Sequence, residues 1–198
     1  VRGRGWGWGA AVAESMGQGV GRTVGEGMKE RTTMGESELL ALLDRLGIQY
    51  ERVEHPAVFT FEEAEALVPH LPGVHTKNLF LRDGKGRRHF LVVVASEARV
   101  DLKALAGVLA IGKLGMASEE RLLLHLGVTP GAVTILGVVN AEPGVVELVI
   151  DTSVLAAGDP LHCHPLVNTS TLAIEWKDLQ QLFDAIGQSW IAVDVPSR

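Results

Sequence analysis

The sequence predicts an α+β fold, a single domain in which helices flank a mixed, mostly antiparallel sheet. Short strand-like runs follow one another closely and are joined by turns, which favours hairpins. Helical stretches interrupt these runs irregularly, without the strict strand–helix alternation of a doubly wound sheet. The chain has 198 residues, of which 46% are hydrophobic, and this length and apolar content suit one core.

The charge and cysteine content argue against several classes of protein. There are 18 Lys and Arg against 24 Asp and Glu, and the net charge of −6 disfavours a protein that coats long nucleic acid. A local basic patch is still compatible with this charge. No apolar run approaches the roughly 18 residues needed to span a bilayer, so we expect no membrane association. The lone Cys163 forms no internal disulfide and suits a reducing cytoplasm.

Residues 1–35 differ from the rest of the chain because they are rich in glycine and show no sustained apolar period. Ordering so many glycines costs conformational entropy, so we predict a flexible extension followed by a folded domain at 36–198. The alternating Gly-Arg and Gly-Trp steps leave an RNA-binding arm open as an alternative. The arginines leave an organelle transit peptide open, although Glu14, Glu26 and Glu30 weaken that interpretation.

The elements of the domain follow from periodicity and from capping signals. Leucines at helical spacing predict a helix up to residue 46, which Gly47 ends, and residues 48–53 alternate like a strand. Capping-box spacing at Thr60 predicts a helix over 60–68. The further expected elements are strands 78–81 and 89–95 around a turn at 83–86, helices 102–107 and 119–126 with Asp101 and Ser118 as N-caps, strands 110–116, 133–139, 146–150, 171–174 and 190–193, a loop at 127–131, and a helix at 176–186.

Several familiar site motifs are missing from the sequence. It contains no dinucleotide-binding or phosphate-binding glycine loop in the required strand–helix context, and no G-x-S-x-G elbow. On a strand, His162 and His164 share a face and Cys163 takes the other. A zinc site would need one or two further ligands at defined spacing, so we predict no metal. We expect His162 and Cys163 to be packing residues, and His89 and His125 to lie at the surface or at helix ends.

Polar residues on loops beside apolar strands are the remaining candidates. Lys77 and Asn78 stand at the start of a strand, where burial is costly unless they are used, although Lys77 can extend to solvent and Asn78 can cap the strand. His55 and His164 each precede a proline, which fixes the backbone beside an imidazole but also suits any tight turn.

Taken in order, these segments resemble one known family. The stretch from Glu36 to Val195 resembles the YbaK/ProX aminoacyl-tRNA deacylases, and the HTKNLFL form points to the ProXp-ala (PrdX) branch of free-standing prolyl-tRNA editing proteins. The segments that carry the resemblance are HPAVFTFEEA at 55–64, GVHTKNLFLRDGKGRRHFLVVV at 73–94, RVDLKALAG at 99–107, ASEERLLLHLGVTPGAVTILGVVN at 117–140 and HCHPLVNTSTLAI at 162–174.

The resemblance implies hydrolysis of the ester that joins a wrong amino acid, alanine, to proline tRNA. It implies catalytic roles for Lys77, Asn78 and His164, and for a glycine loop from Gly127 to Gly131 whose backbone N–H groups surround the scissile carbonyl. No nucleophilic pair is evident, so we expect attack by a positioned water, helped by the ribose 2′-OH.

The resemblance also implies the substrate-binding residues and the partners. We expect the acyl pocket and its wall to involve His55, Pro130, Asn168 and Thr169. A patch for acceptor-stem phosphates is expected at Arg82, Lys85, Arg87 and Arg88, although a solvated turn would look the same.

The expected partners are the CCA end and acceptor stem of mischarged proline tRNA, together with prolyl-tRNA synthetase. We expect a monomer with no cofactor. Two alternatives stay open: a deacylase of the same family that prefers cysteinyl-tRNA, and a non-catalytic tRNA- or protein-binding module of the same fold.

Overall fold

The computed structural model describes residues 33–57 and 71–198. The helix predicted at 60–68 and residues 1–32 of the predicted extension lie outside the described residues. The elements in chain order are α1 (Glu36–Leu46), β1 (Tyr50–Glu54), β2 (Thr76–Asp83), β3 (His89–Ala95), α3 (Leu102–Val108), β4 (Leu114–Met116), α4 (Glu119–Leu126), the 3-10 helix η1 (Ile135–Asn140), β5 (Val146–Asp151), α5 (Thr152–Ala157), β6 (Leu161–Cys163), β7 (Ser170–Ile174), α6 (Trp176–Ile186) and β8 (Trp190–Val193).

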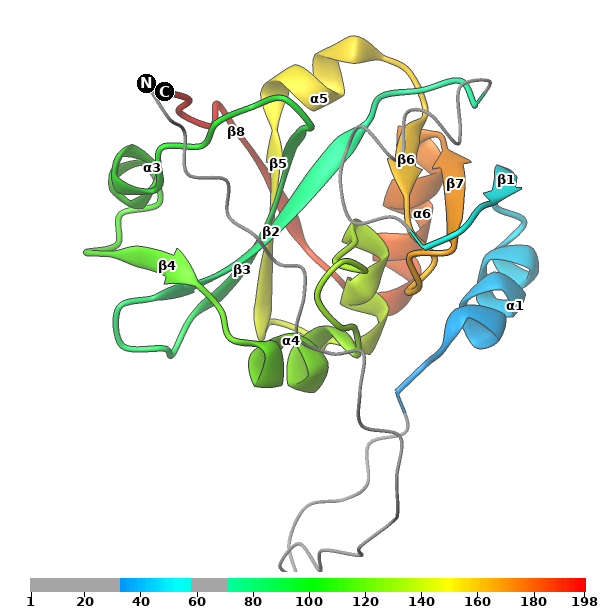
Figure 1. Cartoon of the computed structure of the whole chain (residues 1–198), viewed down its shortest axis with the longest axis horizontal. Coiled ribbons are helices and arrows are strands. Elements are labelled where there is room, and N and C mark those ends of the chain that lie inside the picture. Colours follow the sequence, from blue (N-terminus) through cyan, green and yellow to red (C-terminus); the bar gives the residue numbers. More distant parts are fainter. Residues whose placement is uncertain (1–32, 58–70) are drawn as a thin grey trace, which may run out of the picture. The chain divides into compact units, whose positions relative to one another are not determined.

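The strands form two sheets, and the larger one is mixed (Figure 1). Its order is β4-β2-β3-β5-β8, in which β2 pairs antiparallel with β3 and β4, whereas β5 is parallel to both β3 and β8. The β2–β3 register places Lys77 opposite Val94 and Asn78 opposite Val93. The predicted hairpin over 78–95 and the α+β class are therefore confirmed.

The smaller sheet is antiparallel, in the order β1-β7-β6. It is connected to the segment before β2 by a parallel bridge between Val74 and Leu161. Gly73 makes this close approach possible: its φ is +137°, and a Cβ there would lie 2.3 Å from the carbonyl oxygen of Pro160. Any side chain at position 73 would push β6 away from the start of β2.

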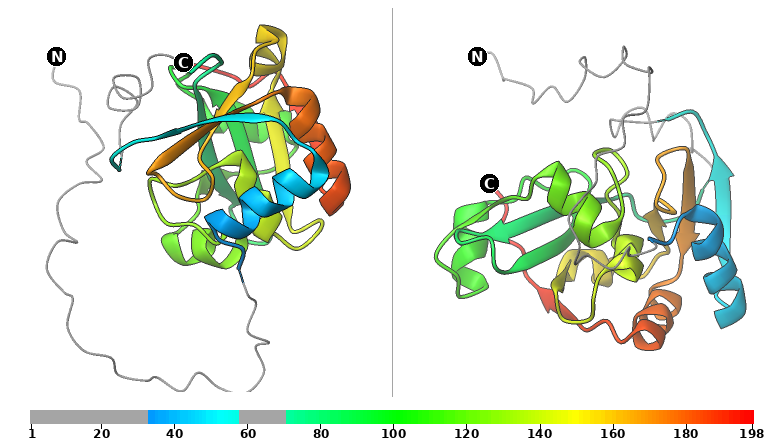
Figure 2. Two further views of the ribbon diagram at one scale, coloured as in Figure 1. Left: turned by 90° about the vertical axis from the view of Figure 1, so that its right-hand side faces the viewer. Right: turned by 90° about the horizontal axis from the view of Figure 1, so that it is seen from below.

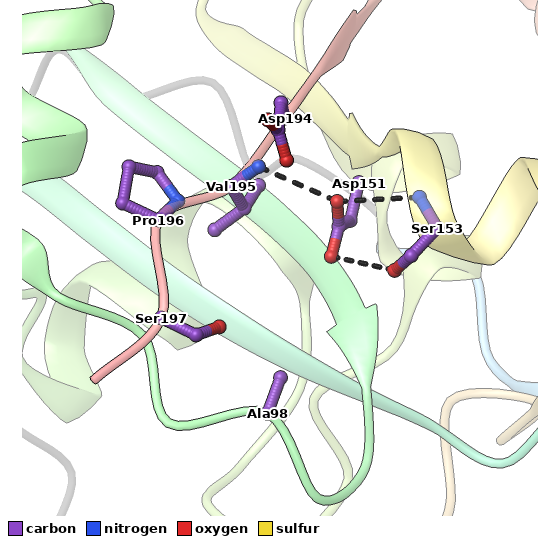
Figure 3. A pocket seen from close by; sticks show the side chains of 7 residues that line it. All are labelled: Ala98, Asp151, Ser153, Asp194, Val195, Pro196 and Ser197. Carbon is purple, nitrogen blue, oxygen red and sulfur yellow. Dashed lines mark hydrogen bonds between the residues drawn. The ribbon is translucent and has the colours of Figure 1, made fainter.

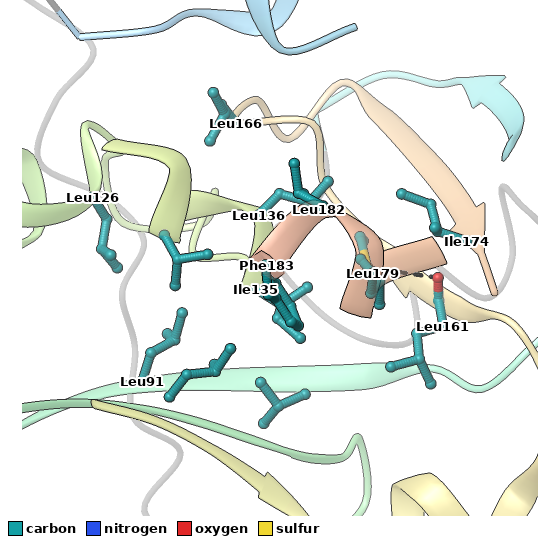
Figure 4. Packing of buried hydrophobic residues seen from close by; sticks show 14 of the residues in the cluster. Leu91, Leu126, Ile135, Leu136, Leu161, Leu166, Ile174, Leu179, Leu182 and Phe183 are labelled. Carbon is teal, nitrogen blue, oxygen red and sulfur yellow. Dashed lines mark hydrogen bonds between the residues drawn. The ribbon is translucent and has the colours of Figure 1, made fainter. Parts of the chain in front are cut away.

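The two faces of the large sheet bury different cores. One face carries Phe80, Leu91 and Val93 and packs against α4, η1, α6 and the small sheet in the main core (Figure 4). The other face carries Leu79, Leu81 and Val94 and packs against α3. The helices α1 and α6 lie side by side next to the small sheet, away from α3 (Figures 1 and 2), and Gln181 donates to the carbonyl of Leu46 at 2.6 Å.

Helix ends follow the predicted capping signals in most cases. Gly47 adopts the left-handed conformation after α1, and the Asp101 carboxylate accepts from the backbone N–H groups of Lys103 and Ala104 at the start of α3. Ser118 precedes α4 as predicted but makes no side-chain capping bond to its backbone.

Two predicted strands are wrong in kind or in length. Residues 135–140 form the buried 3-10 helix η1 instead of a strand, because a short continuous apolar run fits either a buried strand or a buried helical turn. The strand predicted over 110–116 shrinks to β4. Ala110 (φ +53°) and Ile111 instead close α3 by donating to the carbonyls of Gly107 and Ala106, a Schellman arrangement. The six-residue helix α5 has no counterpart among the predicted elements.

Within residues 33–57 and 71–198, none of the helices has the length and apolar character needed to cross a bilayer.

Candidate active site

His164 lies directly after β6, where two features fix its ring. Its Nδ1 lies 2.9 Å from the carbonyl oxygen of Ser170, the first residue of β7. The N–H of Leu166 donates to the carbonyl of His164 at 2.8 Å, which closes a tight turn around Pro165. Leu166 is buried with a φ of +68°. This conformation costs a residue other than glycine about 1–3 kcal/mol, and the burial of the Leu166 side chain in the main core offsets the cost. The bond between His164 and Ser170 and the burial of Leu166 therefore hold this turn in place at both of its ends.

These contacts assign the protonation of His164. A carbonyl oxygen can only accept, so Nδ1 carries the hydrogen. Burial lowers the pKa of His164 below its usual 6.5; the Ser170 carbonyl opposes this shift, and His55 adds to it. The ring is neutral at pH 7, and its Nε2 atom is an acceptor.

His55, an expected substrate-binding residue, lies beside His164. The two ring centroids are 6.1 Å apart. His55 Nδ1 donates to the carbonyl of Pro56 at 2.9 Å, and its Nε2 accepts from the hydroxyl of Thr171 at 2.9 Å. Its backbone N–H donates to the carbonyl of Thr169 at 3.0 Å. The loop of Asn168 and Thr169 thus lies at the same end of the small sheet. The contact between Thr171 and the His55 ring was not indicated by the sequence pattern.

Asn78 lies on the sheet face that is turned toward β6. It shares this face with Thr76, whose hydroxyl donates to the carbonyl of His162 at 3.1 Å, and with its β3 partner Val93 in the main core. The Oδ1 atom of Asn78 is buried and has no hydrogen-bond partner among the residues that the structure describes. Buried polar atoms are nearly always paired, so this acceptor is a candidate position for contact with a ligand.

Lys77 extends to the opposite face of β2. Its neighbours there are Val94 and Leu79 of the second core, and its ammonium group donates to the carbonyl of Ala98. Burial lowers the pKa of Lys77, an effect that Glu97 partly offsets. Lys77 and Asn78 are both expected catalytic residues and are adjacent in sequence, but their side chains lie on opposite faces of β2 and do not meet in one pocket.

The Ala98 segment also borders a cavity of about 520 Å³ at the ends of β5 and β8 (Figure 3). The Asp151 carboxylate in its wall accepts from the hydroxyl of Ser153 at 2.8 Å and from the backbone N–H of Val195 at 3.3 Å. Both carboxylate oxygens therefore have partners within the fold. None of the predicted site residues lines this cavity.

The predicted glycine loop begins at the C-terminal end of α4. Gly127 is left-handed (φ +66°), and its N–H donates to the carbonyl of Leu123 at 3.1 Å. This N–H is occupied by the helix end, so Gly127 anchors the loop and does not supply an oxyanion donor. A turn in which Ala132 donates to Thr129 at 3.1 Å encloses Pro130 and Gly131, and Gly131 also has a positive φ, of 90°. Val128 and Ala132 bury their side chains in the main core together with Leu166.

The basic hairpin differs in part from the prediction. Arg88 makes a bidentate ion pair with Glu147 at 2.7 and 2.8 Å and lies over the ring of Phe90, so its guanidinium is used within the fold. The Asp83 carboxylate accepts from the backbone N–H groups of Arg87 and Arg88 and shapes the turn. Arg82 donates to the Asp83 carbonyl at 3.0 Å, while the side chains of Lys85 and Arg87 are exposed.

Arg121 of α4 joins this hairpin from the other side, a contact that no sequence signal indicated. Its guanidinium contacts the Gly86 carbonyl at 3.1 Å and the Nε2 of His89 at 2.5 Å. His89 is buried, with a ring 4.2 Å from that of His125, so the expectation of a surface residue is wrong for His89. Burial, together with His125 and Arg121, lowers the pKa of His89 to about 4.

His162 and Cys163 serve packing and positioning. The Nε2 of His162 donates to the Pro72 carbonyl at 3.2 Å, and its ring lies 4.3 Å from that of His75. Cys163 is buried in the main core, and burial raises the pKa of its thiol to about 12, so it stays protonated. Among the described residues, no three His, Cys, Asp or Glu side chains are arranged to hold a metal ion.

Comparison of this chain with known proteins shows the family to which it belongs. Residues 55–182 match the aminoacyl-tRNA editing domain. The chain is 39% identical over 157 residues to the prolyl-tRNA editing protein ProX of Acetoanaerobium sticklandii, covering 79% of this chain and 95% of that protein. It is 35% identical over 168 residues to the prolyl-tRNA synthetase associated domain-containing protein 1 of Mus musculus, covering 81% and 99%.

The crystal structure of a proposed trans-editing enzyme for prolyl-tRNA synthetase shares the fold, with a TM-score of 0.63 over 84% of this chain and 100% of that chain at 20% identity. The family match covers the segment that carries His55, Asn78, the 127–131 loop and His164. The chain therefore belongs to the YbaK/ProX family of aminoacyl-tRNA editing domains, which are hydrolases that deacylate mischarged tRNA.

Proposed function

We propose that this protein acts in trans on mischarged proline tRNA and hydrolyses the ester that holds alanine on its 3′ end. The observation that carries this proposal is a pair of polar acceptors on one side of the large sheet. They are the Nε2 of a neutral His164 and the buried Oδ1 of Asn78, which has no hydrogen-bond partner within residues 33–57 and 71–198. Two acceptors suit the α-ammonium group of an aminoacyl ester, which offers three N–H donors.

The proposed reaction needs positioning more than a nucleophile. A water held beside the ester attacks its carbonyl carbon, the C–O bond to the ribose breaks, and the ribose oxygen takes up a proton, helped by the neighbouring 2′-OH. Backbone N–H groups after Gly127 in the 127–131 loop stabilise the developing oxyanion. The Cys163 thiol takes no part, because it is buried and protonated.

Selectivity is proposed to rest on size exclusion. A synthetic site built for proline rejects a smaller amino acid by only about 1–3 kcal/mol, and a second pocket that admits the smaller group and excludes the larger one supplies the rest. His55, Asn168 and Thr169 would form the wall beside His164. Lys77, on the other face of β2, would bind a phosphate of the terminal nucleotides at the edge of the sheet and not the amino acid itself.

The proposed partners are the CCA end and acceptor stem of proline tRNA. Prolyl-tRNA synthetase is proposed as the enzyme whose errors are cleared. We also propose that the chain acts as a monomer in the cytoplasm. Lys85 and Arg87 are exposed cations of the hairpin and are proposed to contact acceptor-stem phosphates, whereas Arg88 is paired with Glu147. The relative named prolyl-tRNA editing protein ProX supports proline tRNA as the substrate.

The test is deacylation of proline tRNA charged with alanine, cysteine or proline, by the wild type and by Lys77→Ala. The proposal requires alanine to be released fastest, with proline retained. Faster release of cysteine would identify the cysteinyl-tRNA deacylase instead. Binding of tRNA without release of any amino acid would identify a non-catalytic module.

A further inference from the structure

The side chain of Asn140, at the end of η1, joins three segments that are distant in sequence. Its Oδ1 accepts from the backbone N–H of Met34 at 2.7 Å, and its Nδ2 donates to the carbonyls of Met34 at 3.0 Å and Leu126 at 3.2 Å. The side chain is 7% exposed. A buried amide whose two donors and whose oxygen are all used holds its partners in one arrangement.

Asn140 lies directly against the first residue of the 127–131 loop. A Cβ on Gly127 would stand 2.6 Å from the Nδ2 of Asn140 and 3.3 Å from the Cβ of Thr33. Gly127 therefore packs between Asn140 and the chain just before α1. The N–H of Gly127 donates to the Leu123 carbonyl of α4, and the carbonyl of Leu126 accepts from Asn140.

We propose that Asn140 is a positioning residue for ester hydrolysis. Together with the backbone of Met34, it fixes the direction in which the chain leaves α4 and so holds the N–H groups of the 127–131 loop toward the substrate carbonyl. This inference rests on the proposed function. It makes the residues immediately before α1 part of the catalytic unit and not only a linker to the glycine-rich segment.

The substitution Asn140→Asp tests this proposal with almost no change in shape. It keeps the acceptor for Met34 but replaces the donor with an anionic oxygen that faces the carbonyls of Met34 and Leu126. In the full-length protein, we expect amide hydrogen exchange at Gly127 and Ala132, whose N–H groups donate to Leu123 and Thr129, to accelerate about tenfold, while β3 and β5 keep their protection. The single-turnover rate on alanyl-tRNA should fall about tenfold, with tRNA affinity changed less than about twofold.

A second pair of variants keeps the proposal testable if Asn140→Asp does not fold. Met34→Pro removes the N–H that donates to Asn140, whereas the matched Met34→Leu keeps it together with the apolar packing. Faster exchange at Gly127 and Ala132 in Met34→Pro, but not in Met34→Leu, supports the proposal.

Unchanged exchange in that loop overturns the proposal that Asn140 holds it, and faster exchange with an unchanged deacylation rate overturns its role in catalysis. A wild type that releases no amino acid refutes the proposed function separately, because hydrogen exchange still reports on the contact between Asn140 and the loop.

Discussion

The Nδ1 atom of His164 donates to the carbonyl oxygen of Ser170 across 2.9 Å, and this bond makes Nε2 the acceptor of a neutral ring. Because β6 and β7 are paired neighbours, the sheet itself holds the donor and the acceptor together. The proposed mechanism depends on this protonation state, since a protonated ring would present an N–H to the ammonium group of the substrate.

The pH dependence of deacylation follows from the lowered pKa of His164. Burial keeps the ring neutral as the pH falls through 6.5, so the rate above the spontaneous background should stay flat there and decrease only at lower pH. Single-turnover rates on alanyl-tRNA between about pH 5 and about pH 8 measure this.

The variant His164→Ala should lower the rate about tenfold or more and remove the acid limb, without loss of the cooperative thermal transition. An acid limb at or above pH 6.5 would contradict the assignment. A collapsed thermal transition in the variant would make His164 a core residue instead.

Substitution of Asn78 should separate activity from stability. Because its buried Oδ1 has no partner among the described residues, Asn78→Ala should change the free energy of unfolding by less than about 1 kcal/mol while raising KM or lowering kcat about tenfold. Urea unfolding and deacylation kinetics on the same preparation measure both. A destabilisation above about 2 kcal/mol would mean that Asn78 serves the fold and not the substrate.

Two hairpin arginines should differ in role, because we expect Arg87 to bind tRNA and Arg88 to stabilise the fold. Arg87→Ala should reduce tRNA affinity and lower the slope of log affinity against log salt by about one. Arg88→Ala should leave that slope nearly unchanged, because its guanidinium is paired with Glu147.

A double-mutant cycle between Arg88 and Glu147 should give a coupling of about 0.5–1 kcal/mol in unfolding. Equal effects of the two arginine substitutions on the salt slope would show that the ion pair opens to bind tRNA.

His89 should make the fold less stable in mild acid. Its pKa is about 4 in the folded protein, against the ordinary histidine value of 6.5, so the unfolded chain takes up a proton first as the pH falls below 6.5. The free energy of unfolding should therefore decrease between pH 6.5 and about pH 4.

His162 and His164 have lowered pKa values and act in the same direction, so His89→Gln should reduce this slope without abolishing it. Gln keeps an acceptor for Arg121 but does not titrate. Urea titrations across this range measure the slope, and an unchanged slope in the variant would assign the effect elsewhere.

Local signals in the sequence predicted most of the fold. Gly47 and Asp101 cap their helices by contacts with residues within one helical turn, so both caps could be predicted without the tertiary structure. The 3-10 helix at 135–140 could not be predicted, because a continuously buried strand and a buried tight helical turn have the same apolar sequence pattern. Ala110 closes α3 in a conformation that usually signals glycine, so residues 110–113 were wrongly predicted to belong to the following strand.

The candidate site was predictable in its residue types but not in its arrangement. The resemblance indicated His55 and His164, yet the partner of His55 is Thr171, 116 residues away, and only the pairing of β1 with β7 brings them together. Strand alternation separates Lys77 from Asn78, although their adjacency in sequence suggested one shared pocket. The contact of Asn140 with Met34, 106 residues away, has no local signature at all.

The most direct measurement is the first-order loss of alanine from charged proline tRNA at neutral pH, with and without an equimolar amount of the protein. We predict an acceleration of about a hundredfold or more over the buffer. We also predict that proline on the same tRNA is released at the buffer rate. Identical decay of alanyl-tRNA in the two samples would contradict the account.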